Sequence, residues 1–246
     1  MSPATDPSRD AARERALIRI QAASGALFAV FLVAHLVNQM FAAAGPAVYD
    51  EMQGQLRAVY QAPLVELACV IGSLLVHIVV SVWRMVRRRR RGQQAPAVPR
   101  LRWQRLTAVV LLIFTFGHLI ATRGASAVYD VYPGFDGVAY TMVWFFAYFF
   151  PYYLLFSLAG LYHALNGLTL ALPRIGLAGP PALRSHRAVV AAWAAGAVAL
   201  ALGLAGFAGA WHDVRERAIA SPYGQLLVDL GVSSGPAQPS SGRPSP

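Results

Sequence analysis

The chain has 246 residues, of which 57% are hydrophobic and only 13% charged, and its formal net charge is +10. This composition excludes an ordinary soluble domain, in which about 25% of residues are charged. It leaves room for about five membrane-spanning helices of ~20 residues each. The single cysteine, Cys69, excludes a disulfide framework and a thiolate metal site. The first apolar stretch is too long for a signal peptide and lacks a small-residue cleavage site.

Long runs with few or no charged residues predict five transmembrane helices, so we expect an all-α membrane protein. The expected spans are residues 20–44, 63–83, 105–123, 137–173 and 188–211. The aromatic block WFFAYFFPYY contains Pro151 and is expected to form a kinked, interface-anchored start of the fourth helix. Gly203, Gly206 and Gly209 recur every three residues on the fifth helix and predict a face for close packing.

The arginines predict the orientation of these helices. All 21 basic residues are arginine, and most lie in the N-terminal arm and in loops 84–105 and 174–187. The two alternate loops hold only Arg57 and Arg123. By the positive-inside rule, the N-terminus is cytoplasmic and the C-terminus lies outside a cell inner membrane. The arginine run then faces lipid headgroups, and no nucleic-acid partner is expected.

The expected domain organisation has three parts. Residues 1–16 form a cytoplasmic arm, whose first twelve residues are polar and frayed. Residues 17–212 form the five-helix domain. Residues 213–246 form an outward-facing tail, which is disordered from about residue 230 because its Gly, Pro and Ser content cannot build a core.

Four histidines lie in the middle of apolar segments, one on each of the first four helices: His35, His77, His118 and His163. At a rise of ~1.5 Å per residue, His35 and His118 lie ~24 and ~20 Å from the cytoplasmic arginines. His77 and His163 lie ~10 to 16 Å from them on the same scale. The histidines therefore form an outer pair and an inner pair. Two imidazoles at one depth are what a metal with two axial histidines requires.

Other roles for these histidines fit the pattern less well. A single membrane histidine most often hydrogen-bonds a neighbouring helix, but such contacts do not need two matched depths. A proton relay would place carboxylates between the levels, and only Glu66 is near. Zinc would need three or four ligands at one level. Two b-type haems agree best with the pattern. The glycines beside the histidines would leave room for a macrocycle or serve helix packing equally well: Gly72, Gly117, Gly160 and Gly167.

Five helices with one mid-span histidine on each of the first four resemble the dihaem cytochrome b membrane anchor of succinate dehydrogenases and fumarate reductases. The resemblance covers roughly residues 17–212. It implies that His77 and His163 hold the haem nearer the soluble subunits, and that His35 and His118 hold the outer haem. The first four helices would thus form a dihaem-binding bundle.

The resemblance also implies residues around the inner haem. Gln21 and Gly25 match a QxxxG step in the family's first helix, where the glutamine contacts a haem propionate. Arg174 matches a basic residue with the same role, and Trp103 matches a further family tryptophan.

The chain departs from the family pattern at two places. Some members carry a glutamate two residues before the helix-four histidine, and Leu161 stands there, which puts a coupled proton path of that type in doubt. Asp50 and Glu51 lie where the family has an acidic residue associated with quinol chemistry, but their spacing assigns that role to neither.

The resemblance implies a subunit that transfers electrons and does not itself act on succinate. A flavoprotein subunit would oxidise succinate, and an iron–sulfur subunit docked on the arginine-rich face would pass electrons through two haem b groups to a quinone, expected to be menaquinone.

Fumarate reduction by the reverse flux and a homo-oligomer of the complex stay open. The alternative is a stand-alone dihaem cytochrome such as a b561-like reductase, which five helices and Gln21 argue against. A third class is a haem-free anchor or transporter that uses histidines for protons.

Overall fold

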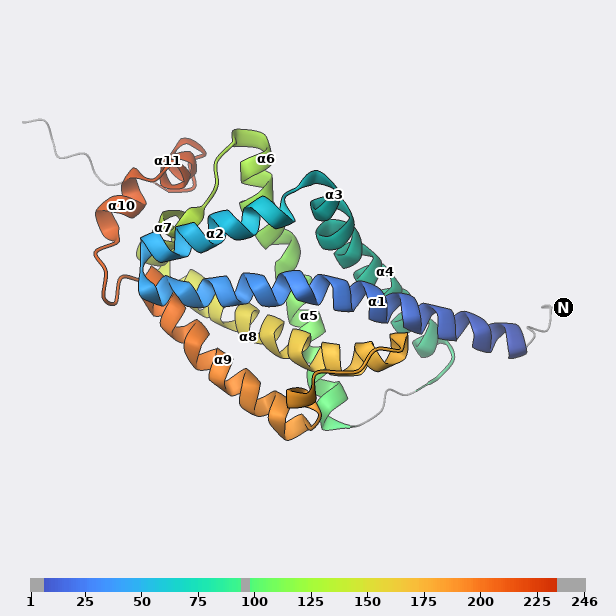
Figure 1. The fold of residues 1–246 in the computed structure, drawn as a ribbon. Coiled ribbons are helices and arrows are strands. Elements are labelled where there is room, and N and C mark those ends of the chain that lie inside the picture. Colours follow the sequence, from blue (N-terminus) through green and yellow to red (C-terminus); the bar gives the residue numbers. More distant parts are fainter. Residues whose placement is uncertain (1–6, 94–97, 234–246) are drawn as a thin grey trace, which may run out of the picture.

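The computed structural model describes residues 7–93 and 98–233, and all regular structure in these residues is helical (Figure 1). Five helices are long and apolar enough to cross a membrane, which confirms the prediction of an all-α, multi-pass membrane protein. These spans are Ser8–Ala44, Pro63–Arg90, Pro99–Tyr129, Phe146–Ile175 and His186–Phe207.

Most spans consist of consecutive helical elements. In chain order they contain α1 (Pro7–Met40) and the 3-10 turn η1 (Phe41–Ala44); α3 (Pro63–Val65), the π-helical η2 (Glu66–Gly72) and α4 (Ser73–Arg90); α5 (Pro99–Leu119), the π-helical η3 (Ile120–Gly124) and α6 (Ala125–Tyr129); α8 (Phe146–Ala171) and the 3-10 turn η4 (Leu172–Ile175); and α9 (His186–Phe207). Pro63 and Pro99 begin the second and third spans, where a missing N–H breaks no helical hydrogen bond. Ser185 caps α9, because its Oγ accepts from the Ala188 N–H at 3.1 Å.

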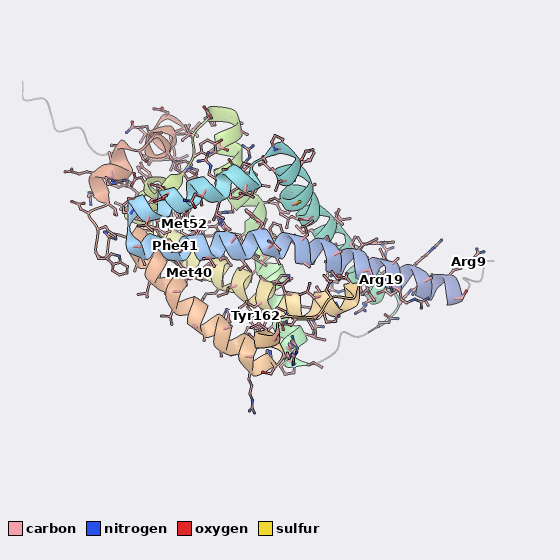
Figure 2. The ribbon with its side chains drawn as sticks, in the orientation of Figure 1. Arg9, Arg19, Met40, Phe41, Met52 and Tyr162 are labelled. Carbon is pink, nitrogen blue, oxygen red and sulfur yellow. The ribbon has the colours of Figure 1, made fainter. Side chains whose placement is uncertain are left out.

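The helix α1 is the centre of the bundle and packs against α4, α8 and α9, while α5 packs against α8 (Figure 1). One end of the bundle holds Arg84, Arg88 and Arg174, and we call it the basic end. Figure 2 shows Arg9 and Arg19 on the N-terminal half of α1 and Met40 at its far end.

The N-terminal turns of α1 pair with the last turns of α4. Asp10 accepts from Arg87 at 2.9 Å and from Arg91 at 2.7 Å, and Glu14 accepts from Arg84 at 2.7 Å. Residues 7–12, expected to be frayed, are therefore helical, because each of these acidic groups faces an arginine of α4. The expected fraying of residues 1–6 lies outside the described residues.

A layer of short helices covers the other end of the bundle, which we call the capped end. This layer consists of α2 (Pro46–Tyr60), α7 (Gly134–Trp144), α10 (Arg215–Ala220) and α11 (Pro222–Asp229). It has its own apolar core, in which Tyr49, Phe135, Tyr140 and Phe207 are almost fully buried. Residues 215–229 of the expected tail are thus folded helices, and the expected disorder of residues 234–246 lies outside the described residues.

The expected fourth span from 137 to 173 is wrong at its start. The helix α7 ends at Trp144, Phe145 leaves the helical conformation with φ −130°, and the membrane span begins at Phe146. Contacts at the capped end hold α7 there, since Asp136 pairs with Arg217 at 3.1 Å and the Phe135 N–H donates to Asp50 at 2.8 Å. The break falls inside the aromatic block.

The expected packing face of α9 includes two of its three glycines. A Cβ at Gly203 would collide with the Gln39 carbonyl oxygen, and one at Gly206 would collide with the Ala42 carbonyl oxygen. Gly209 instead follows the end of α9 with φ +83°. Backbone contact between α9 and the end of α1 therefore depends on Gly203 and Gly206.

Replacing Gly206 with alanine is expected to destabilise the protein by about 1–3 kcal/mol, because a backbone carbonyl cannot move aside as a side chain can. The thermal unfolding midpoint in detergent measures this effect. Gly196→Ala is the matched control on the same helix, because the nearest atoms to its Cβ would belong to the end of the Leu161 side chain and not to backbone. Equal midpoints for the two variants would contradict the close contact at Gly206.

Candidate cofactor site

A large cavity runs through the bundle between α1, α4, α5 and α8. Its volume is about 1420 Å³, and it extends from Arg84 and Arg174 at the basic end to Tyr60 and Arg123 at the capped end. Typical small-molecule pockets have volumes of about 300–1,000 Å³, so this cavity can hold more than one ordinary ligand. Its lining is mainly apolar and includes all four mid-span histidines.

The four histidines meet in the pairs that their depths predict. The ring centroids of His35 on α1 and His118 on α5 lie 6.1 Å apart. Those of His77 on α4 and His163 on α8 lie 6.2 Å apart. Both pairs therefore face each other across the cavity from opposite helices.

This spacing suits one metal ion between two imidazoles. Metal–imidazole bonds are about 2.0–2.1 Å long, and ring atoms joined by bonds of about 1.3–1.4 Å lie roughly 1.1 Å from the ring centre. Two rings on opposite sides of one metal thus have centres about 6.2–6.4 Å apart. Within the described ranges, no three His, Cys, Asp or Glu side chains converge, so the donor set does not match a zinc site. Paired imidazoles in a wide apolar cavity match a porphyrin.

The His77 ring lies against α1 at Gly25. Its Nδ1 is 3.0 Å from the Gln21 carbonyl oxygen, which can accept a hydrogen bond from Nδ1–H and leave Nε2 free as a ligand. A Cβ at Gly25 would lie 2.5 Å from His77 Nδ1. Gly25 therefore allows the ring its position.

The outer pair has different neighbours. His35 stacks on Phe31 with ring centroids 5.6 Å apart, and His118 meets the edge of Phe156 at 5.3 Å. Phe31 in turn contacts Tyr60 at 5.0 Å. Aromatic rings thus position the outer histidines and connect them to the capped end.

Two of the three residues implied around the inner haem line the cavity. The Gln21 amide donates to Ser81 Oγ at 2.7 Å, and its oxygen accepts from Arg84. Arg174 lines the same end of the cavity and interacts electrostatically with Arg84. The structure therefore places Gln21 and Arg174 at the basic end of the cavity, where the Gln21 backbone also contacts His77.

Trp103 is not brought to this cavity. Its side chain is 54% exposed and lines a separate surface hollow with Pro99, Arg102 and Leu106. The next residue, Gln104, lines the cavity instead.

Ser81, Arg84, Gln104 and Thr107 are among the polar residues near the inner pair that the sequence reasoning missed. Ser81 and Arg84 follow His77 by four and seven residues, so helical periodicity alone puts them on its face. Gln104 and Thr107 contact His163, which lies on another helix, and no periodicity of α5 indicates this contact.

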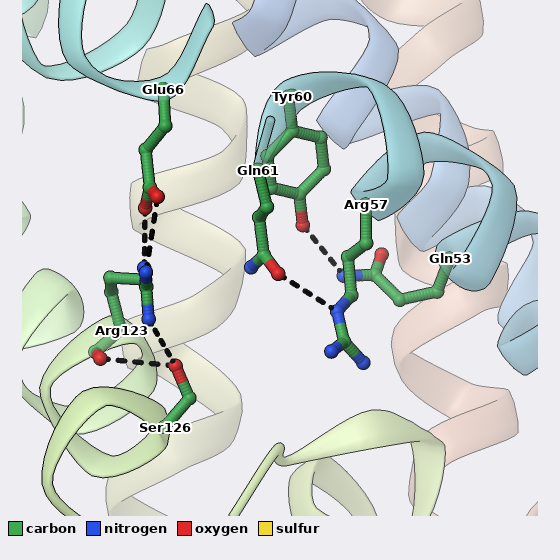
Figure 3. A network of polar contacts seen from close by, with 7 residues as sticks. All are labelled: Gln53, Arg57, Tyr60, Gln61, Glu66, Arg123 and Ser126. Carbon is green, nitrogen blue, oxygen red and sulfur yellow. Dashed lines mark hydrogen bonds and ion pairs between the residues drawn. The ribbon is translucent and has the colours of Figure 1, made fainter. Parts of the chain in front are cut away.

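A second group of polar residues lines the cavity at the capped end (Figure 3). Arg123 pairs with Glu66, with an Nη2–Oε2 distance of 3.0 Å, and donates to Ser126 Oγ at 2.8 Å. Nearby, Gln53 donates to the Tyr60 hydroxyl at 3.0 Å, and the Arg57 guanidinium lies 3.3 Å from the Tyr132 ring centre. Burial raises the pKa of Tyr60, so its hydroxyl stays protonated at neutral pH. We call these residues the capped-end cluster.

The carboxylates considered for quinol chemistry lie elsewhere. Asp50 accepts from the Phe135 N–H at 2.8 Å and holds the start of α7, and Glu51 is exposed on α2. Glu66 is the carboxylate that lines the cavity at this end.

No family model, curated protein or solved structure matches the chain, so these comparisons identify no family.

Proposed function

We propose that the chain is a dihaem cytochrome b that anchors a succinate:quinone oxidoreductase in the membrane and carries its electrons. The observation that carries this proposal is that two pairs of histidines face each other in one cavity. The ring centroids are 6.1 Å apart in one pair and 6.2 Å apart in the other. An isolated structural histidine does not need a partner at this spacing, and a proton relay does not need so large an apolar space.

The side chains at the basic end suit the inner haem. His77 and His163 would hold it, and the Gln21 carbonyl can accept a hydrogen bond from His77 Nδ1–H, which would leave Nε2 as the ligand atom. Arg174 supplies positive charge where carboxylates of the macrocycle would need it, whereas the charge of Arg84 is already paired with Glu14. When bound, the two haems would supply one-electron transfer.

The capped-end cluster suits a quinone headgroup, with menaquinone as the expected type. Tyr60 and Gln53 offer hydrogen-bond donors for a quinone carbonyl, and Glu66 is the carboxylate at this end of the cavity. Reducing a quinone to a quinol takes two electrons and two protons, so both a nearby electron carrier and a proton-exchanging group are needed. The ring contacts from His35 through Phe31 to Tyr60 join this cluster to the outer pair.

The basic end is the proposed docking face for an iron–sulfur subunit that receives electrons from a flavoprotein. It would face the cytoplasm, because arginine-rich ends remain inside the inner membrane. A stand-alone dihaem reductase would have the same histidine pairs but no such subunits, whereas a haem-free transporter would have neither haem nor subunits. Reverse flux would make the complex a fumarate reductase.

The purified protein is expected to contain two b-type haems per chain, both low-spin, because each iron would have two imidazole ligands. Haem content per chain and the reduced-minus-oxidised spectrum measure this. One haem per chain, or none, would contradict the proposal. Copurification of a flavoprotein and an iron–sulfur subunit would support the oxidoreductase, and their absence beside two haems would support the stand-alone cytochrome.

A further inference from the structure

A series of side-chain hydrogen bonds joins Arg100, at the start of α5, to His163 on α8. Arg100 Nε donates to Asn166 Oδ1, and another of its nitrogens donates to Thr169 Oγ1. Asn166 Nδ2 donates to Gln104 Oε1 at 2.7 Å, and Gln104 Nε2 lies 3.2 Å from both the carbonyl oxygen and Nδ1 of His163. Asn166 is fully buried, so its polar atoms depend on these partners.

The arginine determines how both amides are oriented. A guanidinium can only donate, so the Asn166 oxygen must face Arg100 and its NH₂ group must face Gln104. Gln104 then has to accept with Oε1 and direct its own NH₂ group at His163. The charge on Arg100 is therefore connected to the inner pair through two ordered amide dipoles.

Thr107 completes the surroundings of the His163 ring. Its hydroxyl donates to the Trp103 carbonyl at 2.9 Å, so Oγ1 can accept from His163 Nδ1–H, which is 3.3 Å away. Gln104 meanwhile donates to the His163 carbonyl oxygen. An Nδ1–H of His163 that donates to Thr107 would leave Nε2 free as a ligand.

The network makes the two histidine pairs electrostatically unequal. Arg100 donates to the neutral oxygens of Asn166 and Thr169, so these contacts do not cancel its charge. The outer histidines lie against the rings of Phe31 and Phe156 instead. A positive charge favours the state that carries the additional electron, and hydrogen bonds around axial ligands tune haem potentials.

We propose that Arg100, Asn166 and Gln104 form a positioning network that orients His163 and raises the reduction potential of the inner haem relative to the outer one. This inference rests on the proposed dihaem function. Gly167 belongs to the same arrangement, because a Cβ there would lie 3.2 Å from Gln104 Nε2 and would press on the amide.

The test is a spectroscopic redox titration of both haems in the intact membrane complex. Arg100→Gln removes the charge and is expected to lower the midpoint potential of the inner component, with the outer component and the content of two haems unchanged. Arg100→Lys restores the charge and should recover most of the shift. The matched control is Arg102→Gln, an exposed arginine on the same helix that lines the surface hollow.

An unchanged inner midpoint in Arg100→Gln, or an equal shift in Arg102→Gln, would overturn the network while leaving the dihaem function in place. A wild-type protein without haem would instead contradict the proposed function itself. If Arg100→Gln does not assemble, Asn166→Asp is the second variant. It keeps the shape of the side chain and places a negative charge against Arg100, so it should also lower the midpoint potential of the inner haem. Equal loss of both haems in both variants would also overturn the proposal, since it would indicate a general role in folding.

Discussion

Replacing either His35 or His118 with alanine is expected to remove the same haem component, and replacing either His77 or His163 should remove the other. Each iron would need both imidazoles of its pair, and the paired rings lie 6.1 and 6.2 Å apart. Low-temperature reduced-minus-oxidised spectra of membranes measure the two components separately. The expected effect is complete loss of one component with retention of the other.

Misassembly is controlled by variants that keep the volume of the side chain. An alanine leaves a void in the bundle, which could destabilise the whole protein. The spectra of the methionine and tyrosine variants at each position are therefore compared with the spectrum of the alanine variant at equal protein amounts. Loss of the His77 component on substituting His35 would show that the histidines are paired differently, and the topology would have to be revised.

Replacing Gly25 with valine is expected to remove the inner haem component while retaining the outer one. A Cβ at this position would lie 2.5 Å from His77 Nδ1 and 2.6 Å from Cε1, so the ring would have to leave its place against α1. Its contact with the Gln21 carbonyl oxygen would be lost with it. Overpacking of this kind costs about 1–3 kcal/mol. The haem content and the spectrum of the purified variant measure the effect.

Gly117→Ala is the matched control for this substitution. Gly117 also lies next to a proposed ligand, His118, but a Cβ there would have no neighbour within 4 Å. This variant should keep both haem components. An unaltered inner component in Gly25→Val would show that His77 does not need its place against α1.

The spans and the histidine pairs could be predicted because each depends on short-range regularities. Apolar runs between arginines indicate helices that cross a membrane, and a fixed rise per residue turns sequence distance into depth. Similar depth was enough to pair His35 with His118 and His77 with His163, because two rings can come within about 6 Å only when their residues lie at similar levels of the bundle.

The separation of α7 from α8 at the capped end could not be predicted, because it depends on contacts between residues far apart in the sequence. Residues 134–171 contain a single charge, Asp136, and Phe145 is neither glycine nor proline, so no local signal separates α7 from α8. The break depends on distant contacts of α7 with α2, α10 and α11. Trp103 was expected at the site because it matches a family tryptophan by its position in the sequence. A shift of one residue along a helix turns the side chain by about 100°, so Gln104 faces the cavity and Trp103 does not.

The position of α7 has a consequence for how the protein is made. During insertion, the apolar stretch that becomes α7 and α8 emerges as one segment, yet α7 has to be held outside the span. Several of the groups that bury it, among them Phe207, Ala218 and Tyr223, come from residues synthesised later. Arg217, the partner of Asp136, is also synthesised later. The capped end is therefore the last part to assemble, and α7 reaches its final place only after the C-terminal segment has been synthesised. A chain stopped before residue 215 would leave the start of α8 undefined even though all five spans had been inserted.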